Sequence, residues 1–219
     1  PFKVSDIVSS VKNKSPHLVF TTSSLQQEAS IKLGFPVKKT MRIAQELYEG
    51  VSINGDLNGL ITYMRTDSTR MSPEFMAAAS KMIKENYGKE YSGFYHQKND
   101  QNAQDAHEGI RPSHLESVPE DIVGSLSSDQ YKLYRFIYYR AIAALMANAK
   151  NEVNTITLSS GVNDYTLNGH TQIFDGYLKV YSQYETSNDV ILPELKKDEK
   201  LDAKKVEGKQ HFTEPPLRY

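Results

Sequence analysis

The sequence predicts an α+β fold in which a mainly helical region is followed by a strand-rich one. Residues 21–150 carry helix start and stop signals around apolar residues spaced three or four positions apart. After residue 150 the apolar residues alternate in short runs separated by glycines, a pattern typical of strands. The chain has 219 residues, enough for one large or two small domains with a buried core.

The first two helices are predicted from caps and apolar spacing. Ser23 and Ser24 each stand three residues before a glutamine, which is the capping-box spacing, and Gly34 should end this helix. A second helix is expected over residues 37–49. Its apolar positions are Val37, Met41, Ala44, Leu47 and Tyr48, and its polar face carries Lys38, Arg42, Gln45 and Glu49. That polar face either is solvated or lines a site.

Two more helices have clear start signals. Ser72 before Pro73 begins one that should end near Gly88. Residues 93–119 are polar and lack helical spacing, so we expect a long loop, which in compact domains is often functional. A capping box at Ser127 begins a helix that should run to about Ala149.

Strands are expected after residue 150. The alternating runs are residues 153–158, 165–167, 172–174 and 177–181. Charged residues dominate positions 194–209, which indicates a solvated linker or an exposed loop.

Composition excludes several classes of protein. The chain has no cysteine, so disulfides and thiolate zinc sites are excluded. A net charge of −1 argues against binding nucleic acid mainly through a polybasic surface, but it allows a local basic groove. No apolar run approaches the roughly 18 residues of a membrane span, and no secretory leader is present. We therefore expect a soluble, cytoplasmic protein that does not bind membranes.

The most informative stretch is residues 61–71, where Tyr63 lies two positions from Arg65 among polar residues. If residues 60–65 are extended, the two side chains share one face and can address one phosphate. A tyrosine hydroxyl has a pKa of about 10, so it needs a positive neighbour or a base before it attacks phosphorus. A guanidinium supplies that charge and binds phosphate oxygens. The alternative is a core tyrosine beside an arginine that merely reaches the solvent.

A second candidate site lies in residues 105–112. If this stretch is helical, His107 and Arg111 share a face and could grip a phosphate together. The alternative is an ordinary surface histidine. A zinc-protease motif would need a second histidine at the position of Arg111, so that metal site is excluded.

Other chemistry is less well supported. The sequence has no glycine-rich phosphate loop and no acidic cluster suited to Mg²⁺, so we expect no metal site in this chain. Tyr131, Tyr134 and Tyr138 recur at helical spacing and could stack on unpaired bases, but a helix-packing core is the simpler interpretation.

Residues 59–69, which read Gly-Leu-Ile-Thr-Tyr-Met-Arg-Thr-Asp-Ser-Thr, resemble the active-site signature of bacterial type IA DNA topoisomerases, the topoisomerase I class. Residues 20–29, 44–50, 106–112 and 212–219 resemble other segments of that family in the same order. The resemblance therefore spans nearly the whole chain. Departures are small: Gly109 and Leu217 differ from the expected residues, and the connection over residues 51–58 is long.

The resemblance implies an activity and a set of site residues. Tyr63 would cleave one strand of negatively supercoiled DNA through a 5′-phosphotyrosyl link, allow strand passage and reseal the break. Arg65 would stabilise the scissile phosphate. The expected DNA contacts are Gln45, Glu49, His107 and Arg111, and the residues expected to order the tyrosine loop are Thr66, Asp67 and Ser68.

The resemblance also implies a domain organisation. Residues 16–148 would form a helical lid that bears Tyr63, inserted into a β-rich arch made of residues 1–15 and 149–219. The family's Toprim domain, which holds Mg²⁺, would precede Pro1, and further DNA-binding domains would follow. The partners would be single-stranded or negatively supercoiled DNA and the remaining domains, in the cytoplasm at the nucleoid. The chain alone would then be a central fragment, inactive without the Toprim domain.

Two other readings remain open on the residues alone. A non-catalytic helical module for DNA binding or protein interaction has no need of Tyr63 beside Arg65. A tyrosine recombinase would place a His-x-x-Arg pair ahead of a late tyrosine, whereas Tyr63 precedes His107 here. A covalent DNA adduct and its polarity separate these alternatives, because recombinases leave a 3′-phosphotyrosine.

Overall fold

The computed structural model describes residues 2–95, 107–185, 189–205, 207–210 and 212–213. The chain divides into two compact units, which are described separately. The helical unit comprises residues 12–151 and 172–188, and the sheet unit comprises residues 1–11, 152–171 and 189–219. The structure has the mixed α+β composition that the sequence predicts. The expected lid and arch boundaries stay a prediction.

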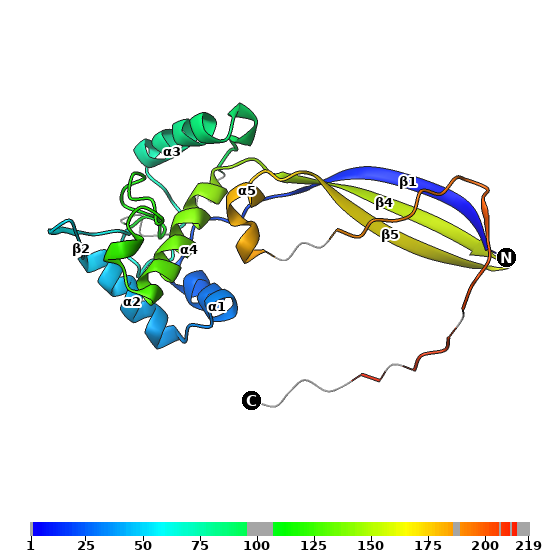
Figure 1. Cartoon of the computed structure of the whole chain (residues 1–219), viewed down its shortest axis with the longest axis horizontal. Coiled ribbons are helices and arrows are strands. Elements are labelled where there is room, and N and C mark those ends of the chain that lie inside the picture. The colour runs from blue at the N-terminus through cyan, green and yellow to red at the C-terminus, as the bar shows by residue number, and fades with distance from the viewer. Residues whose placement is uncertain (1, 96–106, 186–188, 206, 211, 214–219) are drawn as a thin grey trace. The chain divides into compact units, whose positions relative to one another are not determined.

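The helical unit is organised around its longest helix, α4 (Ser128–Ala144), which contacts α1 (Thr22–Leu33), α2 (Val37–Glu49) and the short α5 (Leu178–Tyr181) (Figure 1). Helix α3 (Pro73–Asn86) is followed by the 3₁₀ turn η1 (Lys89–Tyr91). Two other 3₁₀ turns are η2 (Val123–Ser125) and η3 (Ser182–Tyr184). The strands β2 (Val51–Ile53) and β3 (Asp56–Asn58) form a hairpin.

That hairpin accounts for the long connection noted in the sequence. Its two-residue turn is Asn54-Gly55, and both residues have positive φ, at 54° and 93°. Asn-Gly is favoured at such turns because these residues tolerate the left-handed region. The extra residues therefore form an ordered projection between α2 and Tyr63.

Local capping signals predict the helix starts well, with one exception. Ser72 Oγ accepts from the Phe75 N–H, and Ser127 with Gln130 forms the expected capping box. At α1 the predicted caps are wrong, because Thr21 is the N-cap and Ser24 completes its capping box. Gly34 ends α1 as predicted, with φ at 67°.

Helix α4 ends at Ala144, five residues before the predicted end at Ala149. The backbone of the next residues bonds to another segment, since Gly93 N donates to Leu145 O and Ala147 N donates to Tyr91 O. Ala149 instead begins strand β4. No local stop signal marks this end, so the tertiary contact with residues 91–93 ends the helix.

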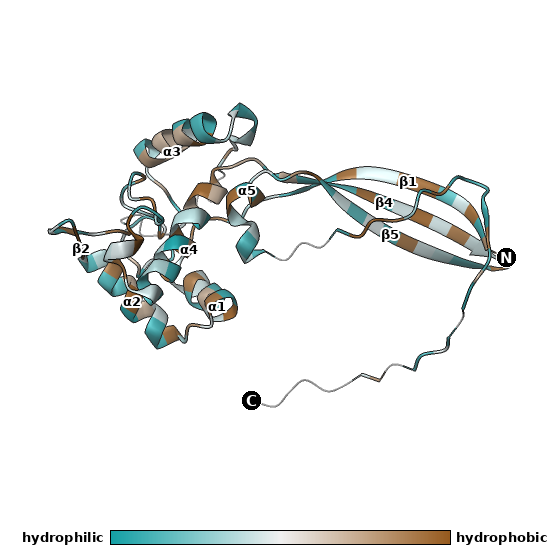
Figure 2. Cartoon of the chain, viewed as in Figure 1, coloured by the Kyte–Doolittle hydropathy of each residue, from teal (hydrophilic) through white to brown (hydrophobic). Residues whose placement is uncertain are grey.

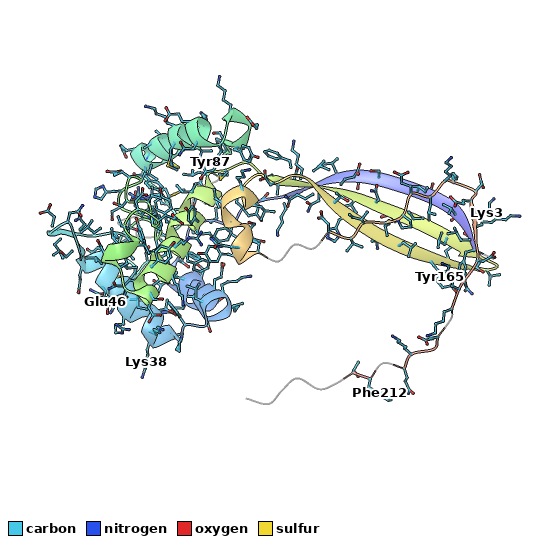
Figure 3. The ribbon with its side chains drawn as sticks, in the orientation of Figure 1. Lys3, Lys38, Glu46, Tyr87, Tyr165 and Phe212 are labelled. Carbon is cyan, nitrogen blue, oxygen red and sulfur yellow. The ribbon has the colours of Figure 1, made fainter. Side chains whose placement is uncertain are left out.

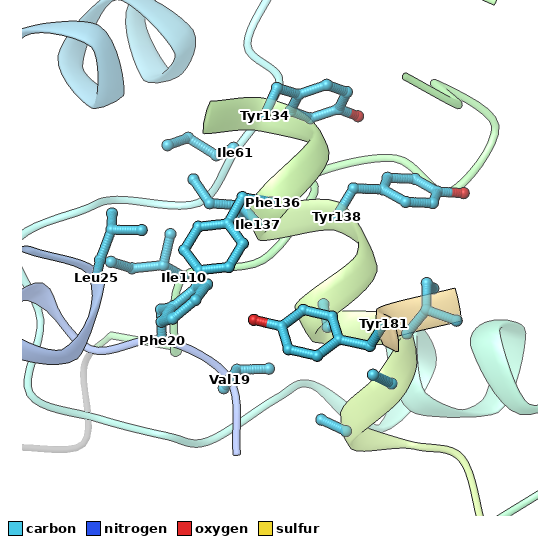
Figure 4. Close-up of a cluster of buried hydrophobic side chains, with 14 of the residues drawn as sticks. Val19, Phe20, Leu25, Ile61, Ile110, Tyr134, Phe136, Ile137, Tyr138 and Tyr181 are labelled. Atoms are coloured by element: carbon cyan, nitrogen blue, oxygen red, sulfur yellow. The ribbon is translucent and has the colours of Figure 1, made fainter. Parts of the chain in front are cut away.

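Two of the three tyrosines predicted to recur along α4, Tyr134 and Tyr138, belong to the core, as the helix-packing interpretation predicts (Figure 4). Tyr131 is half-buried and is not one of the buried core residues. Tyr134 and Tyr138 are buried, and their hydroxyls donate to Ser117 O and Leu115 O at 2.6 and 2.7 Å. Burial raises the pKa of both hydroxyls. These rings are therefore unavailable for stacking on bases.

The predicted strand at residues 177–181 is wrong. Residues 178–181 form the helical turn α5, which brings buried Tyr177, Leu178 and Tyr181 into the core of the helical unit. Gly176 precedes the turn with φ at 50°, and a Cβ there would crowd the carbonyl oxygens of Ala147 and Asn148. A run this short does not distinguish helical from strand spacing.

The sheet has the strand order β5-β4-β1-β6. Its strands are β1 (Phe2–Lys14), β4 (Ala149–Ser160), β5 (Asn163–Phe174) and β6 (Lys200–Leu201), and β1 pairs antiparallel with β6. Two of the predicted strands, residues 165–167 and 172–174, are parts of β5. Hydrophobic and polar residues alternate along the strands, as Figure 2 shows. Residues 194–199 are mainly exposed, as predicted for residues 194–209, but residues 200–201 within that range form β6 and pair with β1.

Two predicted local conformations near the candidate site are not observed. Residues 60–65 are irregular apart from an isolated bridge between Ile61 and Pro112. The described part of the second candidate, residues 107–112, is not helical, because Ile110 and Pro112 form isolated bridges to Phe20 and Ile61. The predicted loop has no helix in residues 93–95 and 107–119. Residues 96–106 and Leu217 lie outside the described residues.

In the part of the chain that the structure describes, no helix combines the length and the apolar character needed to cross a bilayer.

Candidate active site

The loop that carries Tyr63 is bonded to the N-terminus of α1 on one side. Thr22 N donates to Thr66 O, and Thr22 Oγ1 donates to Met64 O, both at 2.8 Å. Thr66 N donates in return to Thr22 Oγ1 at 2.8 Å. Thr22 follows the N-cap of α1, so the first turn of this helix fixes the main chain on the C-terminal side of Tyr63.

The other side of the loop is bonded to residues 109–113. Thr62 N donates to Arg111 O at 3.0 Å, and Thr62 Oγ1 donates to Gly109 O at 2.8 Å. Ser113 N donates to Leu60 O at 2.9 Å. The main chain is therefore held immediately before and immediately after Tyr63.

Gly109 has no Cβ, and this allows residues 109–113 to lie this close to the loop that carries Tyr63. A Cβ at this position would collide with Val19 Cγ2 and would lie 3.2 Å from Ser68 O. The departure from the residue expected by family resemblance therefore has a packing reason. Its backbone also takes part in the site, because Gly109 N donates to Arg70 O at 2.8 Å.

Tyr63 and Arg65 flank Met64, whose side chain is fully buried. The Tyr63 side chain is half-buried against the edge of the core and that of Arg65 is exposed. The exposed arginine fits both interpretations of this stretch, but Tyr63 is not fully enclosed as a core tyrosine would be. Arg65 makes no hydrogen bond or ring contact with Tyr63. Its guanidinium thus remains exposed next to the phenol in sequence, where a phosphate could reach it.

Two rings contact the ring of Tyr63. The Tyr48 ring, from the last turn of α2, packs edge-on with centroids 5.3 Å apart and an interplanar angle of 66°. The His107 ring lies with its centroid also 5.3 Å away, tilted by 34°. Sequence segments about 15 and 44 residues away thus meet at one phenol.

Tyr48 is the site residue that the sequence interpretation missed. It was assigned to the apolar stripe of its helix, but it is 41% exposed, and Val37 of the same predicted stripe is also exposed. A tyrosine next to the polar positions Gln45 and Glu49 was the available signal. Its contact with Tyr63 depends on the tertiary fold, which helical spacing does not reveal.

Gln45 and Glu49 lie one turn apart on α2 and contact each other, since Gln45 Nε2 donates to Glu49 Oε1 at 2.5 Å. Tyr48 lies in the same turn and contacts Tyr63, so these polar groups belong to the helix end that borders the candidate nucleophile. Their hydrogen bond is exposed, so a site-lining role for this part of the polar face stays a prediction.

Arg111 does not pair with His107 as expected from the sequence, because its guanidinium has other partners. Its guanidinium donates to the Glu108 carboxylate and to Pro112 O, and it lies 4.4 Å from the centroid of the Phe75 ring. The side chain is only 11% exposed, and Nε has no hydrogen-bond partner among the described residues. Glu108 already neutralises this cation. The sequence interpretation did not identify Glu108, although its spacing of three residues from Arg111 was a signal.

The short polar residues after Arg65 have separate roles in the loop. Thr66 Oγ1 accepts from Ser68 N and Ser68 Oγ accepts from Arg70 N, both at 3.1 Å. Asp67 is exposed between them. Thr66 and Ser68 thus satisfy backbone donors of the loop, while the Asp67 carboxylate faces solvent.

Among the described residues, no group of three or more histidine, aspartate and glutamate side chains could hold a metal ion. The arrangement offers a phenol, an imidazole and an exposed guanidinium. These groups are suited to nucleophilic attack on a phosphodiester and to binding its charged oxygens.

Comparisons with known proteins agree with the resemblance in the sequence. The model of a family described as DNA topoisomerase matches residues 1–219. DNA topoisomerase 1 of Rickettsia bellii is 44% identical over 228 residues, an alignment that covers 100% of this chain and 28% of the relative. The same protein of Rickettsia prowazekii is 42% identical, covering 100% of this chain and 29% of that relative.

A solved structure, full-length topoisomerase I from Thermotoga maritima, has a TM-score of 0.79 at 39% identity. The alignment covers 90% of this chain and 32% of that structure. The chain therefore spans less than a third of the length of these relatives.

Proposed function

Because the chain belongs to the bacterial type IA DNA topoisomerase family, we propose that Tyr63 is the nucleophile of a reaction that relaxes negatively supercoiled DNA. The observation that carries this proposal is the placement of Tyr63. Its main chain is bonded on both sides, its ring contacts Tyr48 and His107, and its side chain remains partly open to solvent.

The reaction exchanges one phosphodiester bond of the DNA strand for a bond between the phosphate and Tyr63. The Tyr63 oxygen attacks the phosphorus, the bond to the 3′ oxygen breaks, and the phenolic proton leaves as the departing strand gains a 3′ hydroxyl. The 5′-phosphotyrosyl link retains the energy of the original bond, so the reverse attack reseals the strand after another strand has passed. No oxidant or nucleotide is required.

The charged groups nearby have distinct proposed roles. Arg65 binds the scissile phosphate and stabilises the charge that increases on its oxygens in the transition state. His107 contacts a phosphate next to the break, and the polar pair Gln45 and Glu49 borders the same position on α2. Thr66, Asp67 and Ser68 order the loop. Arg111 contacts DNA only if its ion pair with Glu108 opens, so we give it the weaker role.

Mg²⁺ is the metal ion that the family generally uses. The described residues offer no cluster that fits it, so no step is assigned to a metal on this chain. We propose that the metal ligands belong to a Toprim domain elsewhere in the complete polypeptide. The chain alone should then bind single-stranded DNA without cleaving it.

A test uses end-labelled single-stranded DNA with Mg²⁺. The chain would be assayed alone and in a full-length protein, made by substituting it for the matching segment of Rickettsia bellii DNA topoisomerase 1. We expect labelled protein after denaturation only for the full-length protein, and loss of the label in Tyr63→Phe. An adduct in Tyr63→Phe would reject the assigned nucleophile, and an adduct on a DNA 3′ end would indicate recombinase chemistry. Adduct formation by the chain alone would reject the missing-domain argument.

A further inference from the structure

We propose that Tyr48 is a positioning residue, whose ring holds the Tyr63 ring in the orientation for attack on phosphorus. This inference rests on the proposed role of Tyr63. It concerns the last turn of α2, where three separate contacts join the helix to the nucleophile loop. Figure 3 labels Glu46 on this helix.

The first two contacts fix the loop to the helix end. Leu60 N donates to Leu47 O at 2.8 Å, so the main chain three residues before Tyr63 is bonded to α2. Gly59 lies against the same turn, because a Cβ there would be 2.9 Å from Tyr48 O. These contacts set the distance between the helix and the loop.

The third contact acts on the side chain. The hydrogen bonds at Thr62, Met64 and Thr66 hold the main chain of the loop, but they do not fix the rotamer of Tyr63. Among the described residues, the rings that contact it are those of Tyr48 and His107, each with its centroid 5.3 Å away. Packing of aromatic rings edge to face is favourable beyond the area that it buries.

The two rings are not equivalent. His107 is proposed to contact a phosphate, so DNA competes for its position and its tilted contact with Tyr63 is not a constant restraint. Tyr48 instead belongs to a helix whose end is bonded to the loop, so the main chain holds its ring next to that of Tyr63. Orientation of a nucleophile within a narrow range of approach strongly affects rate, so a fixed ring next to it contributes to cleavage.

The experiment compares Tyr48→Leu with Tyr48→Phe in the full-length protein described above. Leucine removes the aromatic ring, and phenylalanine keeps it without the hydroxyl. We expect Tyr48→Leu to form the covalent adduct about threefold to tenfold more slowly at saturating DNA, the rate equivalent of losing one aromatic pair. Tyr48→Phe should cleave as the unmodified protein does. Affinity for DNA should be unchanged in both.

Tyr131→Leu, on α4, is the matched control, because Tyr131 has no ring contact with Tyr63. Thermal unfolding of each variant shows whether it is folded, and Tyr48→Met provides a second ring-free side chain if the leucine variant is unstable. A normal rate in Tyr48→Leu would overturn the proposal. So would equal losses in the phenylalanine and leucine variants, or weaker binding with normal cleavage of bound DNA.

Failure of the proposed function gives a different result. In that case the unmodified full-length protein forms no adduct, or forms one that survives in Tyr63→Phe. The positioning role of Tyr48 would then fall together with the assignment of Tyr63. If the Tyr63-dependent adduct forms normally, the Tyr48 variants test the positioning role alone.

Discussion

Arg140→Met should destabilise the helical unit strongly, because Arg140 joins three of its elements from a buried position. The side chain is 4% exposed, and its guanidinium binds both carboxylate oxygens of Glu28 at 2.9 and 3.0 Å. It also donates to Leu18 O at 2.7 Å and to the Tyr181 hydroxyl at 3.1 Å. Removing one partner of a buried ion pair typically costs about 3–5 kcal/mol. We expect the lower end of that range here, since Glu28 is 25% exposed and water partly replaces its lost partner.

Urea unfolding followed by far-ultraviolet circular dichroism measures the effect, because the helices lie in the helical unit. The control is Arg135→Met, five residues earlier on the same helix. Arg135 is 27% exposed, and its partner Glu120 is 40% exposed. That exposed pair should be worth no more than about 1 kcal/mol after solvent screening. Equal losses of unfolding free energy in the two variants, or a loss below about 1 kcal/mol for Arg140→Met, would refute the reasoning.

Two further predictions concern the site and the surface of α4. His107→Ala should raise the barrier to DNA cleavage by about 1.5–3 kcal/mol if the imidazolium donates to a phosphate. An unchanged rate of adduct formation would reject that contact. His107→Phe keeps a ring beside Tyr63, so this variant separates the effect of packing from that of charge. Burial opposes ionisation of Glu120, but hydrogen bonds from Arg135 and Tyr139 hold the pKa of this carboxyl below its ordinary value. Its contribution to stability is therefore present above the ordinary glutamate pKa of about 4.3 and is lost as the pH falls through the lower folded value. Unfolding at a series of pH values should show a smaller acid-side loss in Glu120→Gln than in the unmodified chain, and equal losses would contradict this assignment.

The sequence predicted those parts of the fold that local chemistry determines. Ser72 with Pro73 and Ser127 with Gln130 begin helices because their side chains bond the first backbone N–H groups of the same segment. The end of α4 depends on bonds to residues 91–93, and the helical turn at residues 178–181 depends on packing against α4. Both are tertiary effects. A pattern within one segment does not contain them.

The same distinction applies to the candidate site. Tyr63 and Arg65 are candidates because they lie within the motif of residues 59–69, and His107 because it lies in a second motif. The pairing of His107 with Arg111 assumed a helix, and the structure has isolated bridges there, with Glu108 bound to Arg111. The spacing places Tyr48 among the apolar positions of its helix, and only the fold shows its contact with the Tyr63 ring. The arrangement of these side chains thus depends on tertiary contacts that residue types and spacing do not contain.

The restraints on Tyr63 determine which movements are easy. Moving its main chain away from the helical unit would break hydrogen bonds at Thr62, Met64 and Thr66, each worth about 0.5–1.5 kcal/mol net. Turning its ring breaks none of these bonds and loses packing contacts, among them those with Tyr48 and His107. Ring reorientation is therefore cheaper than displacement of the loop. A larger displacement of Tyr63 that keeps these bonds carries α1, the end of α2 and residues 109–113 with it, because the loop is bonded to all three.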